Sequence, residues 1–201
     1  MKTAMRRPLA WAAIAIALAG CAGTPPDRHY RLVLRGEAPV LAAPPAPLPV
    51  VAVAAVSVPE LVDRPQIVTL GPGSQVFLNE QHRWAEPLKL AIGRLVAERL
   101  AATLGGARVT AYPAEAGTEP GYRVSLAVQR FDSEPGVAAH TTVLWTVRRL
   151  ADGRHSAGRS AQSTQPADAS LDALADAHAQ ALARVADDIA RGVAELAPST
   201  R

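Results

Sequence analysis

The chain has 201 residues and a single cysteine, with 21 Lys and Arg against 18 Asp and Glu. One cysteine cannot form a disulfide framework, so the fold has to depend on its hydrophobic core. Three of the basic residues, Lys2, Arg6 and Arg7, stand at the extreme N-terminus, and without them 18 basic residues face 18 acidic ones. A balanced charge of this kind argues against a nucleic-acid partner, which requires a basic face.

The N-terminal residues have the build of a secretory signal. After the basic start comes an uncharged apolar run, Leu9–Ala19, which is shorter than the ~20 residues needed to span a membrane. The next residues, Leu18-Ala19-Gly20-Cys21, resemble the lipobox of bacterial lipoproteins, in which the cysteine is lipidated and becomes the new N-terminus. An ordinary signal peptide with a chance cysteine is the alternative. We predict a signal peptide at 1–20, lipidation of Cys21, a lipidated tether at 21–28 and a single domain at 29–198.

Strands are predicted for the first part of this domain. Residues 29–35 alternate between apolar and polar side chains, the period of a half-buried strand. The Pro- and Ala-rich segment 36–49 predicts a loop. Residues 50–58 form a near-continuous run of Val and Ala, typical of a central strand covered on both faces. Short strands are predicted at 66–70 and 75–78, around a Gly-Pro-Gly turn at 71–73.

Two long helices are predicted, with further strands between them. The first helix covers 84–104, where apolar residues beginning with Trp84 and Leu88 recur at helical spacing and Gly105-Gly106 ends the pattern. The second covers 170–196 and carries Asp187 and Arg191 at i,i+4 spacing on its polar side. The strands between the helices are predicted at 108–112, 122–131, 137–147 and 154–162, the last polar enough for a sheet edge.

The alternation of apolar residues on one side of these strands predicts a sheet with one buried face. Two amphipathic helices are available to cover it. The sequence therefore predicts an α+β fold in two layers, a mostly antiparallel or mixed β-sheet with two long amphipathic helices packed on one face.

The sequence lacks a recognisable catalytic set. Gly71–Gln75 is Gly-rich but lacks the Gly-Lys-Ser/Thr ending of a phosphate-binding loop, and no metal or nucleophile motif is found. His178 lies on the apolar stripe of the last helix, which favours a hydrogen-bonded core histidine over a ligand. Asp187 and Asp188 are adjacent on a helix and point about 100° apart, which favours a solvated face over an acid/base pair. We expect no catalytic residue, no metal and no cofactor.

Two short clusters are left unexplained by composition. One is the loop Val58–Val68, in which Asp63 and Arg64 are either a local ion pair or partner-facing charges. The other is Arg83–Leu88, in which Trp84 is either a staple that holds the helix start on the core or part of a binding surface. Asp63, Arg64, Arg83 and Trp84 are the candidate partner-binding residues.

These clusters resemble those of a known family. A lipobox, a strand with Tyr30-x-Leu32, the segment Asp63-Arg-Pro-Gln-Ile-Val68, the helix start Arg83-Trp-Ala-Glu-Pro-Leu88 and the strand 122–131 occur in the order typical of ABC-type transport auxiliary lipoproteins of the PqiC/YmbA kind. The resemblance covers residue 30 to about 145.

The resemblance implies a non-catalytic periplasmic partner of an MCE-type lipid transport system, docked to its MCE-domain protein at the outer membrane. Ala22-Gly23 lacks the Asp that retains enterobacterial lipoproteins at the inner membrane, which fits this location. A homo-oligomer is compatible with this role, because a cap on a tunnel is most easily built as a ring, but the sequence does not give the oligomeric state. Two alternatives are a lipoprotein that itself binds a lipid or small apolar ligand, and a purely structural envelope lipoprotein.

Overall fold

The computed structural model describes residues 26–35, 50–105, 107–111 and 120–198. The predicted signal peptide, Cys21, most of the tether and the Pro/Ala-rich loop lie outside the described residues. Two helices and two mixed sheets, one of five strands and one of three, make up the described chain, which confirms the α+β fold.

The larger sheet has the strand order β5-β2-β6-β7-β8. The central strand β2 runs parallel to both of its neighbours, and β6, β7 and β8 form an antiparallel meander. The turns of the meander contain Gly136 and Gly153, which adopt positive φ angles of 71° and 74° that favour glycine. The polar strand β8 is an edge, as predicted. The strands are β5 (Val109–Ala111), β2 (Val51–Ser57), β6 (Tyr122–Glu134), β7 (Ala138–Arg149) and β8 (His155–Thr164).

The smaller sheet has the order β1-β4-β3 and was not separated from the larger one by the sequence pattern. A β-hairpin forms its main part, and β1 adds to β4 in parallel over three residues. Pro59 ends β2 because it has no N–H for a sheet ladder, and the following loop leads the chain into a different sheet. The strands are β1 (Arg28–Tyr30), β3 (Gln66–Leu70) and β4 (Val76–Trp84).

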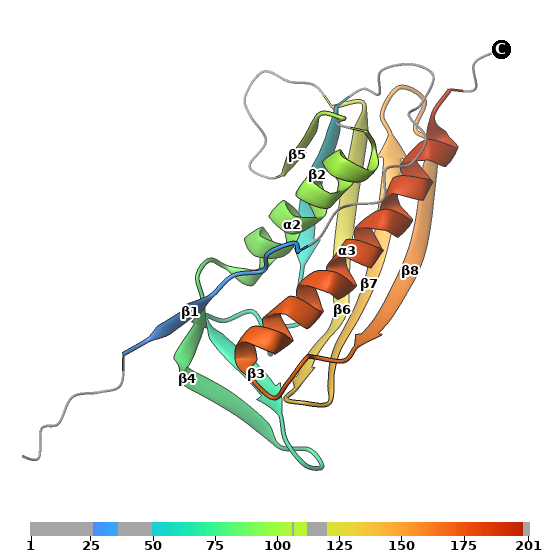
Figure 1. The fold of residues 1–201 in the computed structure, drawn as a ribbon. Coiled ribbons are helices and arrows are strands. Elements are labelled where there is room, and N and C mark those ends of the chain that lie inside the picture. Colours follow the sequence, from blue (N-terminus) through green and yellow to red (C-terminus); the bar gives the residue numbers. More distant parts are fainter. Residues whose placement is uncertain (1–25, 36–49, 106, 112–119, 199–201) are drawn as a thin grey trace, which may run out of the picture.

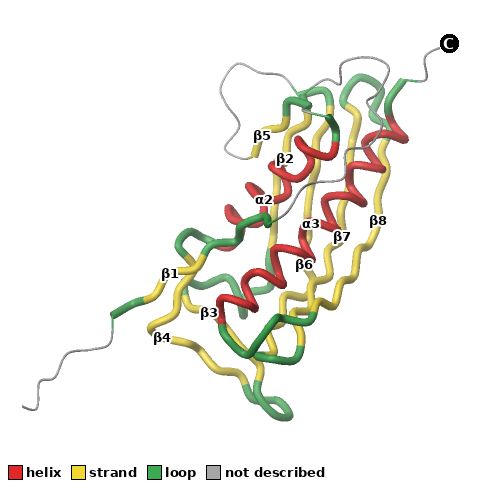
Figure 2. Tube along the Cα trace, in the orientation of Figure 1, coloured by secondary structure: helices red, strands yellow, loops and turns green. Residues whose placement is uncertain are grey.

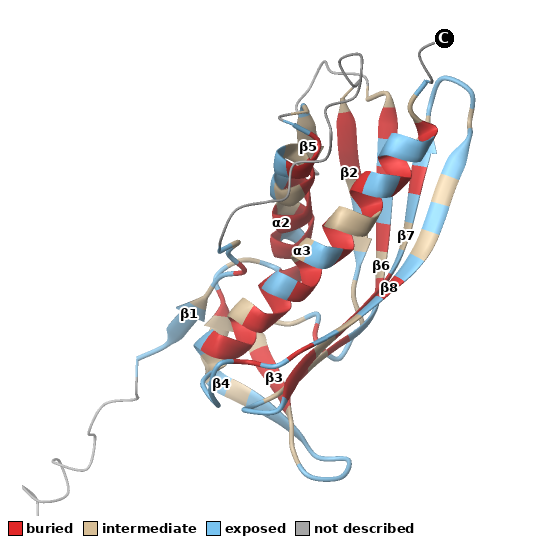
Figure 3. Ribbon diagram, turned by 45° about the vertical axis from the view of Figure 1, so that its right-hand side comes forward, coloured by how far each residue is buried: buried red, intermediate tan, exposed pale blue. Residues whose placement is uncertain are grey.

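The helices α2 (Leu88–Thr103) and α3 (Leu171–Leu196) cover one face of the five-stranded sheet, as predicted (Figure 1). Helix α2 lies over β2 and β5, and α3 lies over β7 and β8. The main core fills the space between the helices and this sheet. Figure 3 shows how buried and exposed residues alternate along the strands, with the buried stripes of both helices turned toward the sheet. The side chain of Ser170 caps α3 by accepting a hydrogen bond from the N–H of Ala173, at 3.1 Å.

Several details of the predicted elements are wrong. The strand predicted at 29–35 covers only Arg28–Tyr30, and the one predicted at 75–78 extends to Trp84. The first helix begins at Leu88 and not at Trp84, since Pro87 disfavours helical geometry in the residue before it. Val137 does not share the buried face of β7 but lies in the preceding turn, 62% exposed. Strand β2 is fully buried only over Val51–Val53, because the short β5 pairs with these residues and leaves Ala54–Ser57 less covered.

Candidate functional site

The two clusters that composition left unexplained lie side by side. In the β3–β4 hairpin Gln66 pairs with Arg83, and the N–H of Trp84 donates to the carbonyl oxygen of Pro65 at 2.8 Å. This pairing joins the loop before β3 to the segment between β4 and α2. Together, residues 63–65 and 84–88 line a surface pocket of about 300 Å³.

The two acidic residues of this pocket are already engaged with cations. Asp63 forms an ion pair with Lys89 in the first turn of α2, at 2.8 Å between Oδ2 and Nζ. Glu86 forms an ion pair with Arg94 at 2.8 Å. The loop is therefore held to α2 by Asp63 and Lys89, and of the two alternatives for Asp63 and Arg64, an ion pair between them is not the contact that the described chain makes.

Arg64 is the charged residue of the pocket that has no ion-pair partner among the described residues. Its side chain is half-buried, and its Nε is buried without a hydrogen-bond partner in the part of the chain that the structure describes. A buried donor without a partner costs about 1–3 kcal/mol, and more when it belongs to a charged group. The residue as a whole is only half-buried, so its charge still acts on the pocket that it lines.

The start of α2 adds positive potential at the same place. Its N-cap is Pro87, which makes no side-chain hydrogen bond, and the first turn contains no acidic residue. The first backbone N–H groups of a helix have no partner inside the helix, and the helix dipole is positive at this end. The pocket thus combines apolar walls with a free guanidinium and the N-terminus of a helix, a combination that suits a carboxylate on an apolar segment.

The remaining two candidate residues occupy different positions. Trp84 is buried, 8% exposed, as predicted, and its ring packs edge-on against Phe131 with 6.3 Å between ring centroids. It lines the pocket from the end of β4 and not from the helix start. Arg83 does not line the pocket. Its Nε lies 3.4 Å from the carboxylate of Asp27, just before β1.

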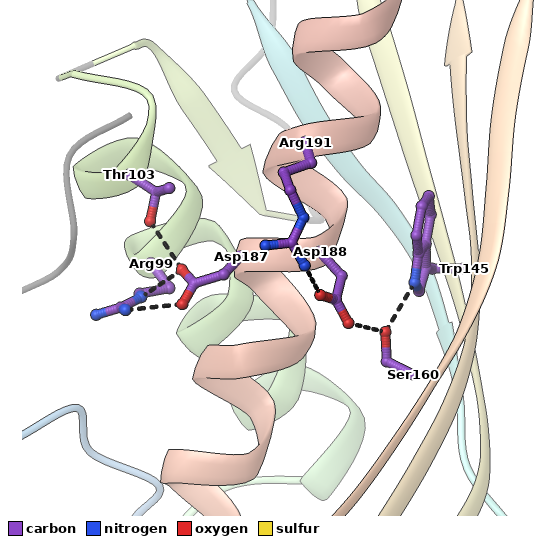
Figure 4. Close-up of polar contacts among 7 residues, drawn as sticks. All are labelled: Arg99, Thr103, Trp145, Ser160, Asp187, Asp188 and Arg191. Atoms are coloured by element: carbon purple, nitrogen blue, oxygen red, sulfur yellow. Dashed lines mark hydrogen bonds and ion pairs between the residues drawn. The ribbon is translucent and has the colours of Figure 1, made fainter. Parts of the chain in front are cut away.

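A second polar cluster joins α3 to its neighbours (Figure 4). The predicted pair of Asp187 with Arg191 is wrong, because Asp187 turns inward and accepts bonds from Arg99 at 2.8 and 2.9 Å and from Thr103 at 3.1 Å. Arg191 instead contacts Asp188. No local pattern could reveal the Arg99 contact, since the partners are 88 residues apart.

Asp188 points away from Asp187, as the helix spacing predicts. It was expected to lie on a solvated face, but it is hydrogen-bonded to the sheet. It accepts a hydrogen bond from Ser160 on β8, whose Oγ also accepts from the indole N–H of Trp145 at 3.0 Å. The indole of Trp145 packs on Gly158 and Gly192, where an added Cβ would lie 2.4 and 3.0 Å from the ring. These contacts fasten α3 to the sheet and are structural.

His178 is a core histidine, as predicted. It is fully buried, and its ring nitrogens hydrogen-bond the hydroxyls of Ser133 at 2.9 Å and Thr141 at 3.0 Å. Its ring stacks on Phe131 with 3.8 Å between centroids. Burial lowers the pKa of His178 to about 3, and the nearby His140 acts in the same direction. The histidine therefore stays neutral in the folded protein at neutral pH.

Neither a metal site nor a membrane-spanning helix is found among the described residues. No group of three or more His, Cys, Asp or Glu side chains in these ranges is arranged to hold a metal ion. None of the helices described is long and apolar enough to cross a membrane.

Solved structures share this fold. A crystal structure described as that of an uncharacterized protein is 18% identical, with a TM-score of 0.67, covering 86% of this chain and 100% of that one. A crystal structure of a protein from Xanthomonas campestris is also 18% identical, with a TM-score of 0.64. The match covers 84% of this chain and 98% of that one. A PelC dodecamer from Paraburkholderia phytofirmans has a TM-score of 0.42 at 15% identity, covering 75% and 92%. At these identities the first two similarities concern the fold alone.

The fold is that of an α+β domain, and the sequence comparison identifies its family. Residues 30–190 match the model of the ABC-type transport auxiliary lipoprotein component, so the chain belongs to this family. Among curated proteins, none matches the chain in sequence.

Proposed function

We propose that this protein is a non-catalytic, lipid-anchored docking component of an ABC/MCE-type lipid transport system, at the periplasmic face of the outer membrane. Membership of a transport auxiliary family supports the general role. The pocket of residues 63–65 and 84–88 supports docking. The observation that carries the proposal is Arg64, which lines the pocket with no ion-pair partner among the described residues, while both acids of the pocket pair elsewhere.

The alternative of a lipid carrier is less well supported. The two pockets that stand out among the described residues have volumes of about 300 and 330 Å³, at the lower limit of the range for small ligands. Many side chains of the main core are completely buried, including Leu95 on α2 and Leu182 on α3. A filled core with surface pockets favours a binding surface over an internal lipid cavity.

Charge reversal of Arg64 tests the docking site. We expect Arg64→Glu to lose co-purification with the MCE-domain protein, because a charge-assisted contact worth about 1.5–3 kcal/mol is removed, which is roughly a 10- to 100-fold loss of affinity. The melting temperature should not fall, because Arg64 makes no ion pair within the described chain and its buried Nε has no hydrogen-bond partner there.

The control is Arg159→Glu, which makes the same change of charge at an exposed position on the edge strand β8. This variant should bind the MCE-domain protein normally. If Arg64→Glu also binds normally, the pocket is not the docking site.

Lipidation is tested separately at Cys21. We expect Cys21→Ser to remain an uncleaved precursor or to be released as soluble protein, because the lipid is then missing. Fractionation of membranes and the size of the protein on a gel measure both effects. Cys21→Ser protein of mature size in the outer-membrane fraction would contradict the anchor, while its fold should be unaffected.

A further inference from the structure

Three exposed large apolar side chains are consecutive in the sequence. Strand β4 begins with Val76, Phe77 and Leu78, which are 41%, 51% and 42% exposed. Successive residues of a strand point to opposite faces of the sheet, so this hairpin has exposed apolar side chains on both faces. Single exposed apolar residues are ordinary, but a contiguous patch marks a surface that contacts something else.

The hairpin is also uncharged. From Gln66 to Asn79 the sequence contains no charged residue, and Glu80 is the first charge after it. Residues 76–79 pair with β3 on one side, while β1 pairs with β4 only from His82 onward. Exposed strand edges usually carry charges that prevent association with other chains. An uncharged apolar tip with an open edge suits the interfacial region of a bilayer, where polar groups reach the unpaired backbone and charges in the hydrocarbon are costly.

The direction of the N-terminal segment indicates which surface the hairpin faces. Because β1 is parallel to the last three residues of β4, residues 26 and 27 lie on the same side of β1 as the residues that precede His82 in β4. Both β1 and the loop of the hairpin lie in the lower half of Figure 2, and the C-terminus of α3 lies at the top. Cys21 is five positions before Pro26, where the described chain starts, which is at most roughly 18 Å of extended chain.

We propose that the tip of the β3–β4 hairpin, residues 70–79, inserts into the interfacial region of the membrane that holds the lipid on Cys21. The lipid and the hairpin are then two contacts at one end of the domain, which together orient it on the membrane. The inference rests on the predicted lipid anchor and does not require the MCE partner.

The test uses the mature lipidated protein with Leu78→Cys, labelled with the fluorophore NBD and reconstituted into phosphatidylethanolamine/phosphatidylglycerol vesicles. The control is Ala151→Cys, in the exposed turn between β7 and β8 at the other end of the sheet. Protein with neither substitution should take no label, because the lipid occupies the sulfur of Cys21. The label at 78 should show blue-shifted emission and be quenched by nitroxide-labelled lipids, and the label at 151 should emit as in water.

Phe77→Asp in the Leu78→Cys protein should return the emission at 78 to that of water, with an unchanged melting temperature. Water-like emission at 78 without this change would overturn the proposal. A blue shift that nitroxide lipids do not quench would also overturn it, in favour of contact with a second copy or another protein. Co-purification with the MCE-domain protein, measured on the same variants, tests the docking function independently of this result.

Discussion

Truncation of Trp84 to alanine is expected to lower the free energy of unfolding by about 3–5 kcal/mol, as for other large aromatic side chains in cores. For a domain of this size, that corresponds to a fall in melting temperature of roughly 10 °C. Trp84 ends β4 in the smaller sheet and contacts Phe131 on β6, whose ring also stacks on His178 of α3. The three rings join the smaller sheet, the larger sheet and α3, so loss of Trp84 removes packing where these parts meet.

Denaturant unfolding of the purified mature protein measures this effect. Leu90→Ala is a matched control, because Leu90 is 44% exposed in the first turn of α2 and its truncation should change stability by no more than about 0.5 kcal/mol. Trp84→Phe should lose less than Trp84→Ala, since an aromatic ring remains to contact Phe131. A Trp84→Ala variant as stable as Leu90→Ala would show that Trp84 does not contribute to the core.

Acid destabilisation through His178 is the second large effect that we expect. The pKa of His178 is lowered to about 3 in the folded protein by burial, against an ordinary value of 6.5. Above pH 6.5 His178 is neutral in both the folded and the unfolded protein, so it has no effect on how stability depends on pH. Below pH 6.5 the unfolded chain binds a proton that the folded protein does not. Stability is therefore lost as the pH falls toward 3, by about 1.4 kcal/mol for each pH unit.

The comparison of His178→Gln with the unsubstituted protein isolates this contribution. His140, whose Nε2 lies 3.5 Å from Glu134, is present in both proteins. The unfolding free energy measured between pH 6 and pH 4.5 should fall more steeply for the unsubstituted protein, by about 1.4 kcal/mol per pH unit. Parallel curves would mean that the imidazole takes up a proton in the folded protein.

Local sequence patterns predicted most of the elements and the class of fold. The alternation of Tyr122, Val124, Leu126 and Val128 matches the buried face of β6. The helical period of the C-terminal segment matches α3. Such features are set by residues within a few positions of each other, because the period of a strand or helix follows from backbone geometry.

The sequence identified the residues of the candidate site but did not show that they lie together. Asp63-Arg64 and Arg83-Trp84 were identified as separate clusters, and only the register of β3 on β4 makes them neighbours. The sequence also could not show which charge lacks a partner. Asp63 binds Lys89 rather than Arg64, because the fold brings the loop against the first turn of α2.

The sequence by itself thus determined the α+β class, the helical and strand periods, the family motifs and the predicted lipobox, all of which depend on short contiguous segments. The tertiary structure alone decided the division into two sheets, the partner of Asp187 and the unpaired state of Arg64. It also decided that Val76, Phe77 and Leu78 are exposed, although their composition suits a core. The physical reason is the same in each case. Burial and pairing depend on segments distant in sequence, and the chain brings them together only when it packs.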